Sequence, residues 1–157
     1  MTRVLPFSSK LGFGVGQVAE GVTLGAFSTF LLFYFNQILH VSGTLTGIAL
    51  GIALFCDAIT DPIAGSISDR LETRWGRRHP MMMGAALPLG ISIIALFNPP
   101  TGMSEMFYFG WLVTFSVSAR LFLTLYHIPH LALGAEMAQD YLDRTRVYSF
   151  SQFFGTV

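Results

Sequence analysis

Residues 44–68, TLTGIALGIALFCDAITDPIAGSIS, form one long apolar stretch that carries two acidic residues, Asp57 and Asp61. A helix needs about 20 largely apolar residues to cross the hydrocarbon core of a bilayer, and this stretch is long enough. We therefore predict a membrane-spanning helix here, with two carboxylates at a depth where charges are costly.

The composition of the chain favours a membrane protein over a soluble one. Of the 157 residues, 52% are hydrophobic and only 11% are charged, and the mean hydropathy is +0.58, whereas soluble domains carry roughly 25% charged residues. The formal net charge of zero offers no basic surface for nucleic acid. Cys56 is the single cysteine, so an internal disulfide and a cysteine zinc site are excluded, and no cofactor is predicted.

Three further stretches are apolar enough to span a bilayer. They cover about residues 11–39, 80–97 and 106–133, and a fifth apolar stretch starts at about Val147. The first stretch is too long for a signal peptide, so we expect it to be retained as a helix. The predicted fold class is an all-α polytopic membrane protein, with four transmembrane helices and the start of a fifth in one unit over 1–157.

The basic residues predict the orientation of these spans. The connections at residues 40–43 and 98–105 contain no lysine or arginine, whereas the loop at 69–79 is rich in arginine. Because cytoplasmic loops carry the excess of basic residues, we predict a cytoplasmic N-terminus in a bacterial-type plasma membrane. Eight of the nine basic residues fall on the predicted cytoplasmic side: Arg3, Lys10, Arg70, Arg74, Arg77, Arg78, Arg144 and Arg146.

The two aspartates of the second span predict a cation site. Asp57 and Asp61 are four residues apart, so their carboxylates share one face of a helix and repel each other unless a proton or a cation lies between them. Hard cations bind several oxygen ligands, and Thr60 and Thr124 would add hydroxyl oxygens. The alternative is a structural ion bridge, for example to Arg120, but one arginine does not neutralise two aspartates.

Other ionisable residues also lie in the predicted spans. Glu20 lies in the first span and is predicted to line a transport pathway. His127 and His130 lie in the fourth span, where no third ligand stands at a metal-binding spacing. We therefore predict that the two histidines line a polar cavity and do not form a metal site.

The loop after the second span, residues 65–80, reads GSISDRLETRWGRRHP. Gly65 allows close packing at the end of the helix, Asp69 can pair with a nearby arginine, and Gly76 allows a turn. Pro80 suits the first turn of the following helix. This loop is predicted to act as a latch that holds one conformation closed on the cytoplasmic side.

This loop resembles the charged cytoplasmic loop of the major facilitator superfamily, and the wider pattern resembles its glycoside-pentoside-hexuronide:cation symporter branch. The segments that carry the resemblance follow one another in the expected order over nearly the whole chain. They are KLGFG at 10–14, DAITDP at 57–62, RWGRR at 74–78, YHIP at 126–129, ALGAE at 132–136 and RT at 144–145.

The resemblance implies that the chain is the N-terminal part of a twelve-helix transporter and is not an enzyme. Such a transporter has two six-helix halves around a central cavity and works by alternating access. It would move a sugar, glycoside, uronate or similar small polar solute together with Na⁺, H⁺ or Li⁺. The implied partners are that solute, the coupling cation, the lipid bilayer and the C-terminal half of the same protein.

The resemblance also implies roles for particular residues. The implied cation-binding residues are Asp57, Asp61, Thr60 and Thr124. The implied conformational gate consists of Gly65, Asp69, Arg70, Gly76, Arg77, Arg78 and Arg144. The family's charged sugar-binding positions are held here by Gly21, His127 and Gln152, so the sugar site has diverged. The candidate substrate-binding residues are therefore Glu20, Arg120, His127 and Gln152, of which Arg120 and His127 would favour an anionic substrate such as a uronate.

Three other readings stay open at this point. A small four-helix multidrug exporter would use one essential glutamate, as Glu20 could be, although it has no need of an arginine-rich loop. A membrane phosphotransferase would hold Mg²⁺ with aspartates such as Asp57, Asp61 and Asp69, although its motif order differs. A membrane scaffold would use the aspartates only for stability.

Overall fold

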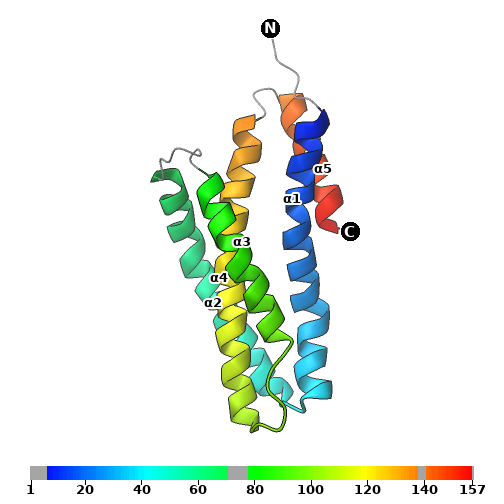
Figure 1. Cartoon of the computed structure of the whole chain (residues 1–157), viewed down its shortest axis with the longest axis vertical. Coiled ribbons are helices and arrows are strands. Elements are labelled where there is room, and N and C mark those ends of the chain that lie inside the picture. The colour runs from blue at the N-terminus through cyan, green and yellow to red at the C-terminus, as the bar shows by residue number, and fades with distance from the viewer. Residues whose placement is uncertain (1–6, 71–77, 138–140, 157) are drawn as a thin grey trace.

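The computed structural model describes residues 7–70, 78–137 and 141–156, and each secondary-structure element in these ranges is a helix (Figure 1). Four of these helices are long and apolar enough to cross a membrane. The described part of the chain therefore confirms the predicted all-α membrane fold.

The helices follow the predicted spans closely. The first helix is α1, Phe7–Gly25, and its path continues through two π-helical segments, Ala26–Leu31 and Tyr34–Ile38. The remaining helices are α2, Gly43–Arg70; α3, His79–Leu96; α4, Glu105–Met137; and α5, Tyr141–Thr156.

Two helices extend beyond their predicted bounds. The fourth span was predicted to end at residue 133, but α4 continues to Met137, and α5 begins at Tyr141 and not near Val147. The added turns contain charged residues such as Glu136 and Arg144. Charged residues end an apolar stretch without ending a helix, because a helix is defined by its backbone hydrogen bonds.

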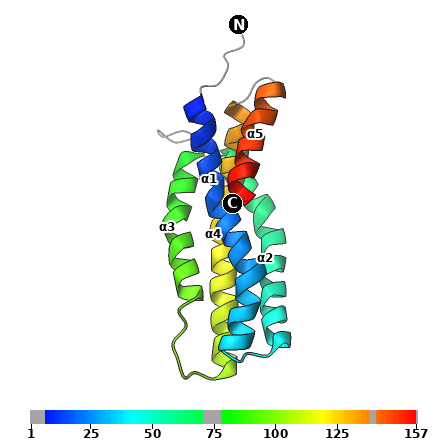
Figure 2. The ribbon, with the colours of Figure 1, turned by 90° about the vertical axis from the view of Figure 1, so that its right-hand side faces the viewer.

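The bundle consists of two groups of packed helices joined through α4. In one group, α4 packs along α2 and α3, and in the other, α5 packs along α1, while α1 also contacts α4. Figures 1 and 2 both show α5 beside the N-terminal half of α1. This packing brings α1, α2 and α4 around a common interior.

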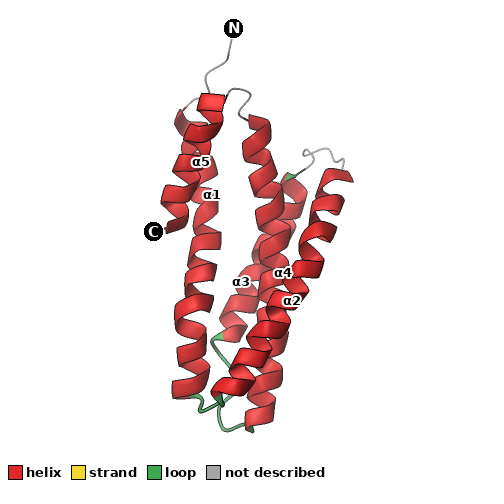
Figure 3. Ribbon diagram, turned by 180° about the vertical axis from the view of Figure 1, so that it is seen from behind, coloured by secondary structure: helices red, strands yellow, loops and turns green. Residues whose placement is uncertain are grey.

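The connections between helices alternate between the two ends of the bundle. Figure 3 shows the loops at residues 39–42 and 97–104 at the end away from the N-terminus, whereas α2, α4 and the beginnings of α3 and α5 reach the other end. This alternation agrees with four successive crossings of a bilayer. The cytoplasmic location of the N-terminal end remains a prediction from the basic residues.

Helices α2 and α4 run in the same direction (Figure 1). Two parallel α-helices have the same rise per residue, so contacting residues on the two helices are separated by a constant number of residues in the sequence. Three polar contacts between these two segments each join residues 63 positions apart: Ser42 with Glu105, Asp57 with Arg120, and Asp61 with Thr124.

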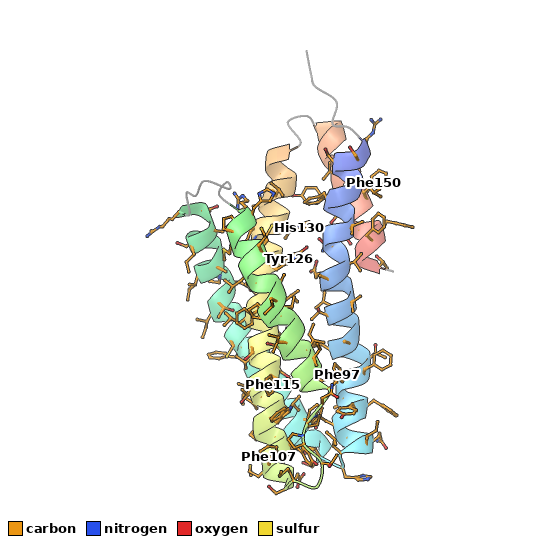
Figure 4. The ribbon with its side chains drawn as sticks, in the orientation of Figure 1. Phe97, Phe107, Phe115, Tyr126, His130 and Phe150 are labelled. Carbon is orange, nitrogen blue, oxygen red and sulfur yellow. The ribbon has the colours of Figure 1, made fainter. Side chains whose placement is uncertain are left out.

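The apolar core lies toward the end away from the N-terminus, where Figure 4 labels Phe97, Phe107 and Phe115. Its buried members come from the first span, the connection after it, α2, α3 and α4: Phe27, Leu31, Phe35, Val41, Ala49, Leu89, Leu96, Tyr108, Leu112, Ala119 and Leu123. The outer faces of the bundle carry many large exposed apolar side chains, such as Leu87 and Met106. Such faces suit contact with lipid or with further transmembrane helices.

Candidate functional site

A polar cavity of about 220 Å³ lies between α1, α2 and α4, within the spans. Apolar side chains complete its wall, but most of its lining is ionisable or hydroxylic. The lining residues are Glu20 and Leu24 from α1, Asp57 and Asp61 from α2, and Arg120, Leu123, Thr124, His127 and Ile128 from α4. The helical spacing of four residues places Asp57 and Asp61 on one face of α2, as predicted.

Asp57 forms an ion pair with Arg120, whose Nη1 donates to Oδ2 of the carboxylate. The two side chains are only 20% and 17% exposed, so the pair is largely shielded from solvent. The guanidinium carbon of Arg120 also lies 5.0 Å from the centre of the Phe27 ring, which adds a cation–π contact with the first span. Arg120 is therefore held between the first and second spans.

Asp61 has a different environment one turn along the same face of α2. Its Oδ1 accepts a hydrogen bond of 2.9 Å from the hydroxyl of Thr124, and the residue is exposed. The structure thus brings Thr124 to the carboxylates, as the sequence predicted.

Thr60 does not join this cavity, contrary to its predicted place beside the two carboxylates. Its hydroxyl lies 3.3 Å from the backbone carbonyl of Asp57, to which it donates a hydrogen bond within α2. A residue one position before Asp61 is rotated by about 100° around the helix, so its side chain leaves the face that Asp61 shares with Asp57. The cavity is lined without Thr60.

Glu20 and His127 connect α1 with α4. Nδ1 of His127 lies 2.9 Å from Oε2 of Glu20. The side chain of His127 is 22% exposed, and that of Glu20 is 19% exposed. The distance is short enough for an ion pair, although neither atom has a partner with hydrogen-bond geometry among the described residues. The ring is charged in this contact only when it carries a second proton.

A second cavity, of about 240 Å³, adjoins the first, since both are lined by Glu20, Leu24 and His127. It lies between α1, α4 and α5, and its lining is rich in amide and hydroxyl groups. The other lining residues are Gln17, Gly21, Leu131, Tyr148, Ser151, Gln152 and Gly155. The Glu20–His127 pair therefore lies in the wall shared by the cavity that contains the two aspartates of α2 and the cavity that contains the amide and hydroxyl groups.

This second cavity brings together three of the four predicted substrate-binding residues, Glu20, His127 and Gln152. Arg120 is the exception: it lines the first cavity and a wider apolar opening, but not this one. The guanidinium of Arg120 is paired with Asp57, and its direct role in substrate binding stays a prediction.

Gln17 and Ser151 were not predicted, and the structure adds them to the site. The hydroxyl of Ser151 donates a hydrogen bond of 3.1 Å to Oε1 of Gln17, and both residues are buried. A signal existed for Gln17, which stands three residues before Glu20 and so shares its helix face. No comparable pattern marks Ser151, whose role depends on the packing of α5 against α1.

The close approach of α1 and α5 explains why Gly21 cannot carry a carboxylate. A Cβ atom on Gly21 would lie 2.2 Å from the backbone carbonyl oxygen of Gly155. No side chain fits at that distance, since the carbonyl oxygen of Gly155 belongs to the backbone and cannot rotate away as a flexible side chain could. The acidic residue of the first span that lines the two cavities is the preceding residue, Glu20.

His130 was predicted to line a polar cavity, and the structure contradicts this. The residue is 2% exposed, and its ring stacks on Phe13, with centroids 4.2 Å apart and an interplanar angle of 9°, and on Tyr126, at 5.8 Å and 11°. The hydroxyl of Tyr126 donates a hydrogen bond of 2.7 Å to the carbonyl of Gly16. His130 therefore belongs to an aromatic stack that joins α4 to α1.

The sequence comparisons identify the protein family. The family described as MFS/sugar transport protein matches residues 12–157. The chain belongs to this family. The match confirms the predicted resemblance to the major facilitator superfamily, and the four apolar helices make this family member a multi-pass membrane protein.

Relatives of this family member are named as symporters and carriers. It is 33% identical over 151 residues to the uncharacterized symporter sll1374 of Synechocystis sp., covering 93% of this chain and 28% of the relative. It is 22% identical over 158 residues to the isoprimeverose transporter of Lactiplantibacillus pentosus, covering 99% and 32% respectively. It is 26% identical over 147 residues to a glucuronide carrier protein homolog of Escherichia coli, covering 94% and 32%. The chain thus spans about a third or less of the length of these relatives.

The predicted gate of this MFS chain is partly described by the structure. Nη2 of Arg78 lies 3.4 Å from Oδ1 of Asp69, and Nη1 donates to the hydroxyl of Ser68 at 3.3 Å, which ties the start of α3 to the end of α2. Gly65 faces α4, where a Cβ would lie 3.9 Å from a methyl of Ile128. Among the other gate residues, Arg70 is exposed at the end of α2. Gly76, Arg77 and the side chain of Arg144 lie outside the described residues.

Proposed function

We propose that this chain is the N-terminal part of a cation-coupled symporter of a sugar, glycoside or similar small polar solute. The family match and the names of the relatives support this function, and the location would be a plasma membrane with the N-terminus in the cytoplasm. The rest of the transporter would close the two cavities from the opposite side.

The observation that carries the proposal is the pair of adjoining cavities with a shared wall at Glu20 and His127. A charged group near the centre of a bilayer costs at least about 2.5–3.5 kcal/mol on insertion scales. The spans nevertheless carry several such groups, and they converge on these cavities. A coupling ion would bind at the carboxylates of α2, and a solute would bind beside Glu20 in the adjoining cavity. Both would then lie next to the Glu20–His127 pair, through which binding of the ion would affect binding of the solute.

The second cavity suits a neutral glycoside better than a uronate. Gln17, Ser151 and Gln152 offer amide and hydroxyl groups, and Glu20 offers a carboxylate that accepts hydrogen bonds from sugar hydroxyls. Two residues were assigned to an anionic substrate: Arg120 is paired with Asp57 in the first cavity, and His127 contacts the carboxylate of Glu20. A solute with hydroxyl groups and no carboxylate is therefore the class we propose.

Uptake of defined sugars by the complete transporter in proteoliposomes tests this function. We expect uptake of the neutral disaccharide isoprimeverose, weakened about tenfold or more by Glu20→Gln, because a hydrogen bond to a charged group contributes about 1.5–3 kcal/mol. Gln37→Ala is a matched control, since Gln37 is exposed at the far end of the first span. Uptake of a glucuronide without uptake of any neutral glycoside would overturn the substrate class, and uptake of neither would overturn the function.

The phosphotransferase alternative finds no support in the described part of the chain. Asp57 is paired with Arg120, and Asp69 is paired with Arg78 beyond the cavity. No group of three histidine, cysteine, aspartate or glutamate side chains gathers there as a metal site. The family is described as one of sugar transport proteins and the relatives are named as symporters, which disfavours both the small multidrug exporter and the scaffold.

A further inference from the structure

Asp57 and Asp61 lie one turn apart on α2, yet their carboxylates differ in exposure and in bonding partners. Asp57 is 20% exposed and bound to the guanidinium of Arg120, whereas Asp61 is exposed and accepts a hydrogen bond from the neutral hydroxyl of Thr124. In the described part of the chain, one carboxylate of the pair thus has a positive partner, and the structure shows none for the other.

The charges around the first cavity can be counted helix by helix. Helix α1 contributes Glu20, α2 contributes Asp57 and Asp61, and α4 contributes Arg120 and His127. Asp57 and Arg120 cancel each other, and Glu20 contacts His127. Asp61 is the acidic lining residue for which the described structure shows no basic partner.

We propose that the guanidinium of Arg120 is a permanent positive charge in the coupling site. This charge excludes Na⁺ and Li⁺ from the site and leaves Asp61 to couple transport to protons. This inference rests on the proposed symport function and names its coupling ion and the residue that determines it. It also makes the two aspartates inequivalent: Asp61 exchanges the coupling ion, and Asp57 holds the arginine.

The chemistry of the two kinds of ion supports this assignment. A hard cation such as Na⁺ needs several oxygen ligands at once, by analogy with other hard-cation sites. Here Oδ2 of Asp57 is taken by an N–H of Arg120, and Thr60 does not line the cavity. The guanidinium would also repel a second cation placed beside it.

A proton needs only one carboxylate oxygen. Thr124 donates to Oδ1 of Asp61, which leaves Oδ2 to form the new O–H bond when the carboxylate takes a proton from one side of the membrane. Release of that proton to the other side restores the carboxylate. The cycle changes the charge of Asp61 between minus one and zero and needs no further reactant.

Carbodiimide labelling of the purified complete transporter tests this inference without a solute. Dicyclohexylcarbodiimide modifies protonated carboxyl groups in apolar surroundings, and mass spectrometry of peptides assigns the adduct. We expect Asp61 to be labelled, with labelling that falls as the pH rises and does not change when Na⁺ or Li⁺ replaces choline at constant pH. Protection of Asp61 by Na⁺ or Li⁺ in the unmodified protein, or no labelling of Asp61 at any pH, would overturn the inference.

The variant Arg120→Gln tests whether the arginine is the determinant. Without the guanidinium, both carboxylates are free to bind Na⁺, and a concentration ten times the dissociation constant should reduce labelling of Asp61 about tenfold. Arg120→Lys keeps the positive charge and should remain insensitive to Na⁺. An Arg120→Gln protein that elutes as a single folded species but shows no protection by Na⁺ or Li⁺ would rule out Arg120 as the determinant.

A pair of variants in uptake assays separates the two aspartates. Asp57→Asn frees Arg120 to pair with Asp61 one turn away, so proton-driven uptake should be lost. The double variant Asp57→Asn with Arg120→Gln removes both charges and should regain it, whereas Asp61→Asn should stay inactive in either background. Failure of the double variant to regain uptake would contradict the inequivalence, while absence of uptake by the unmodified protein would instead contradict the proposed function.

Discussion

Asp61 on α2 accepts a 2.9 Å hydrogen bond from Thr124 on α4, 63 positions further along the chain. Ser42 and Glu105 are separated by the same 63 positions, and so are Asp57 and Arg120. The shared register shows that the parallel packing of two helices, and not a local motif, places each carboxylate of the candidate site opposite its partner.

We predict that Thr124→Val weakens ion coupling by about tenfold or more, because a hydrogen bond to a carboxylate contributes about 1.5–3 kcal/mol. The measurement is the pH dependence of solute uptake by the complete transporter. Thr114→Val is the matched control, since Thr114 is an exposed threonine of α4 whose hydroxyl bonds to Gly110 within its own helix. Equal effects of the two changes would contradict a specific role for Thr124.

Gly21→Ala should destabilise the protein, because its new methyl group would lie 2.2 Å from the carbonyl oxygen of Gly155. Overpacking of this kind costs about 1–3 kcal/mol, and backbone on both sides leaves little room to relax. Gly25→Ala, one turn further along, is the control, since a Cβ there meets nothing within 4 Å. Thermal unfolding in detergent should show a lower midpoint only for Gly21→Ala, and an unchanged midpoint would argue against the close packing of α1 on α5.

Arg78→Gln should reduce the rate of solute uptake about tenfold while leaving solute affinity nearly unchanged, since a gate affects the conformational step more than binding. Arg78 ties α3 to Asp69 and Ser68 at the end of α2. Arg146→Gln provides the comparison, because Arg146 is an exposed arginine of α5 that is not assigned to the gate. A loss of affinity without a loss of rate would contradict the gate assignment.

Glu105→Ala should lower stability by about 1 kcal/mol without altering which ion drives uptake. The change removes the acceptor of the 2.8 Å hydrogen bond from the backbone N–H of Ser42 and an acidic residue in the first turn of α4. Thermal unfolding measures the first effect and ion-dependent uptake measures the second. A changed ion preference would show that the register between α2 and α4 also depends on this contact.

Hydropathy and helical periodicity predicted much of the fold. The four spans were located within a few residues, since apolar length decides whether a helix can cross a bilayer. The shared face of Asp57 and Asp61 followed from their spacing. The early start of α5 at Tyr141 was missed because its first turns are polar.

The candidate site was predicted less completely, because its contacts join different helices. Spacing within one helix could not show whether Arg120 reaches Asp57, which depends on the register between α2 and α4. It also could not show that Thr60 bonds to its own helix or that His130 stacks on Phe13. These outcomes depend on how side chains pack between helices, which the sequence of a single chain leaves open.

The most direct test of the central claim is concentrative uptake of a neutral glycoside by the complete transporter in sealed proteoliposomes. We predict that an inward proton gradient drives the solute above its external concentration and that collapse of the gradient by an ionophore returns it to equilibrium. Accumulation that ignores every imposed cation gradient, or no uptake of any sugar, would contradict cation-coupled symport.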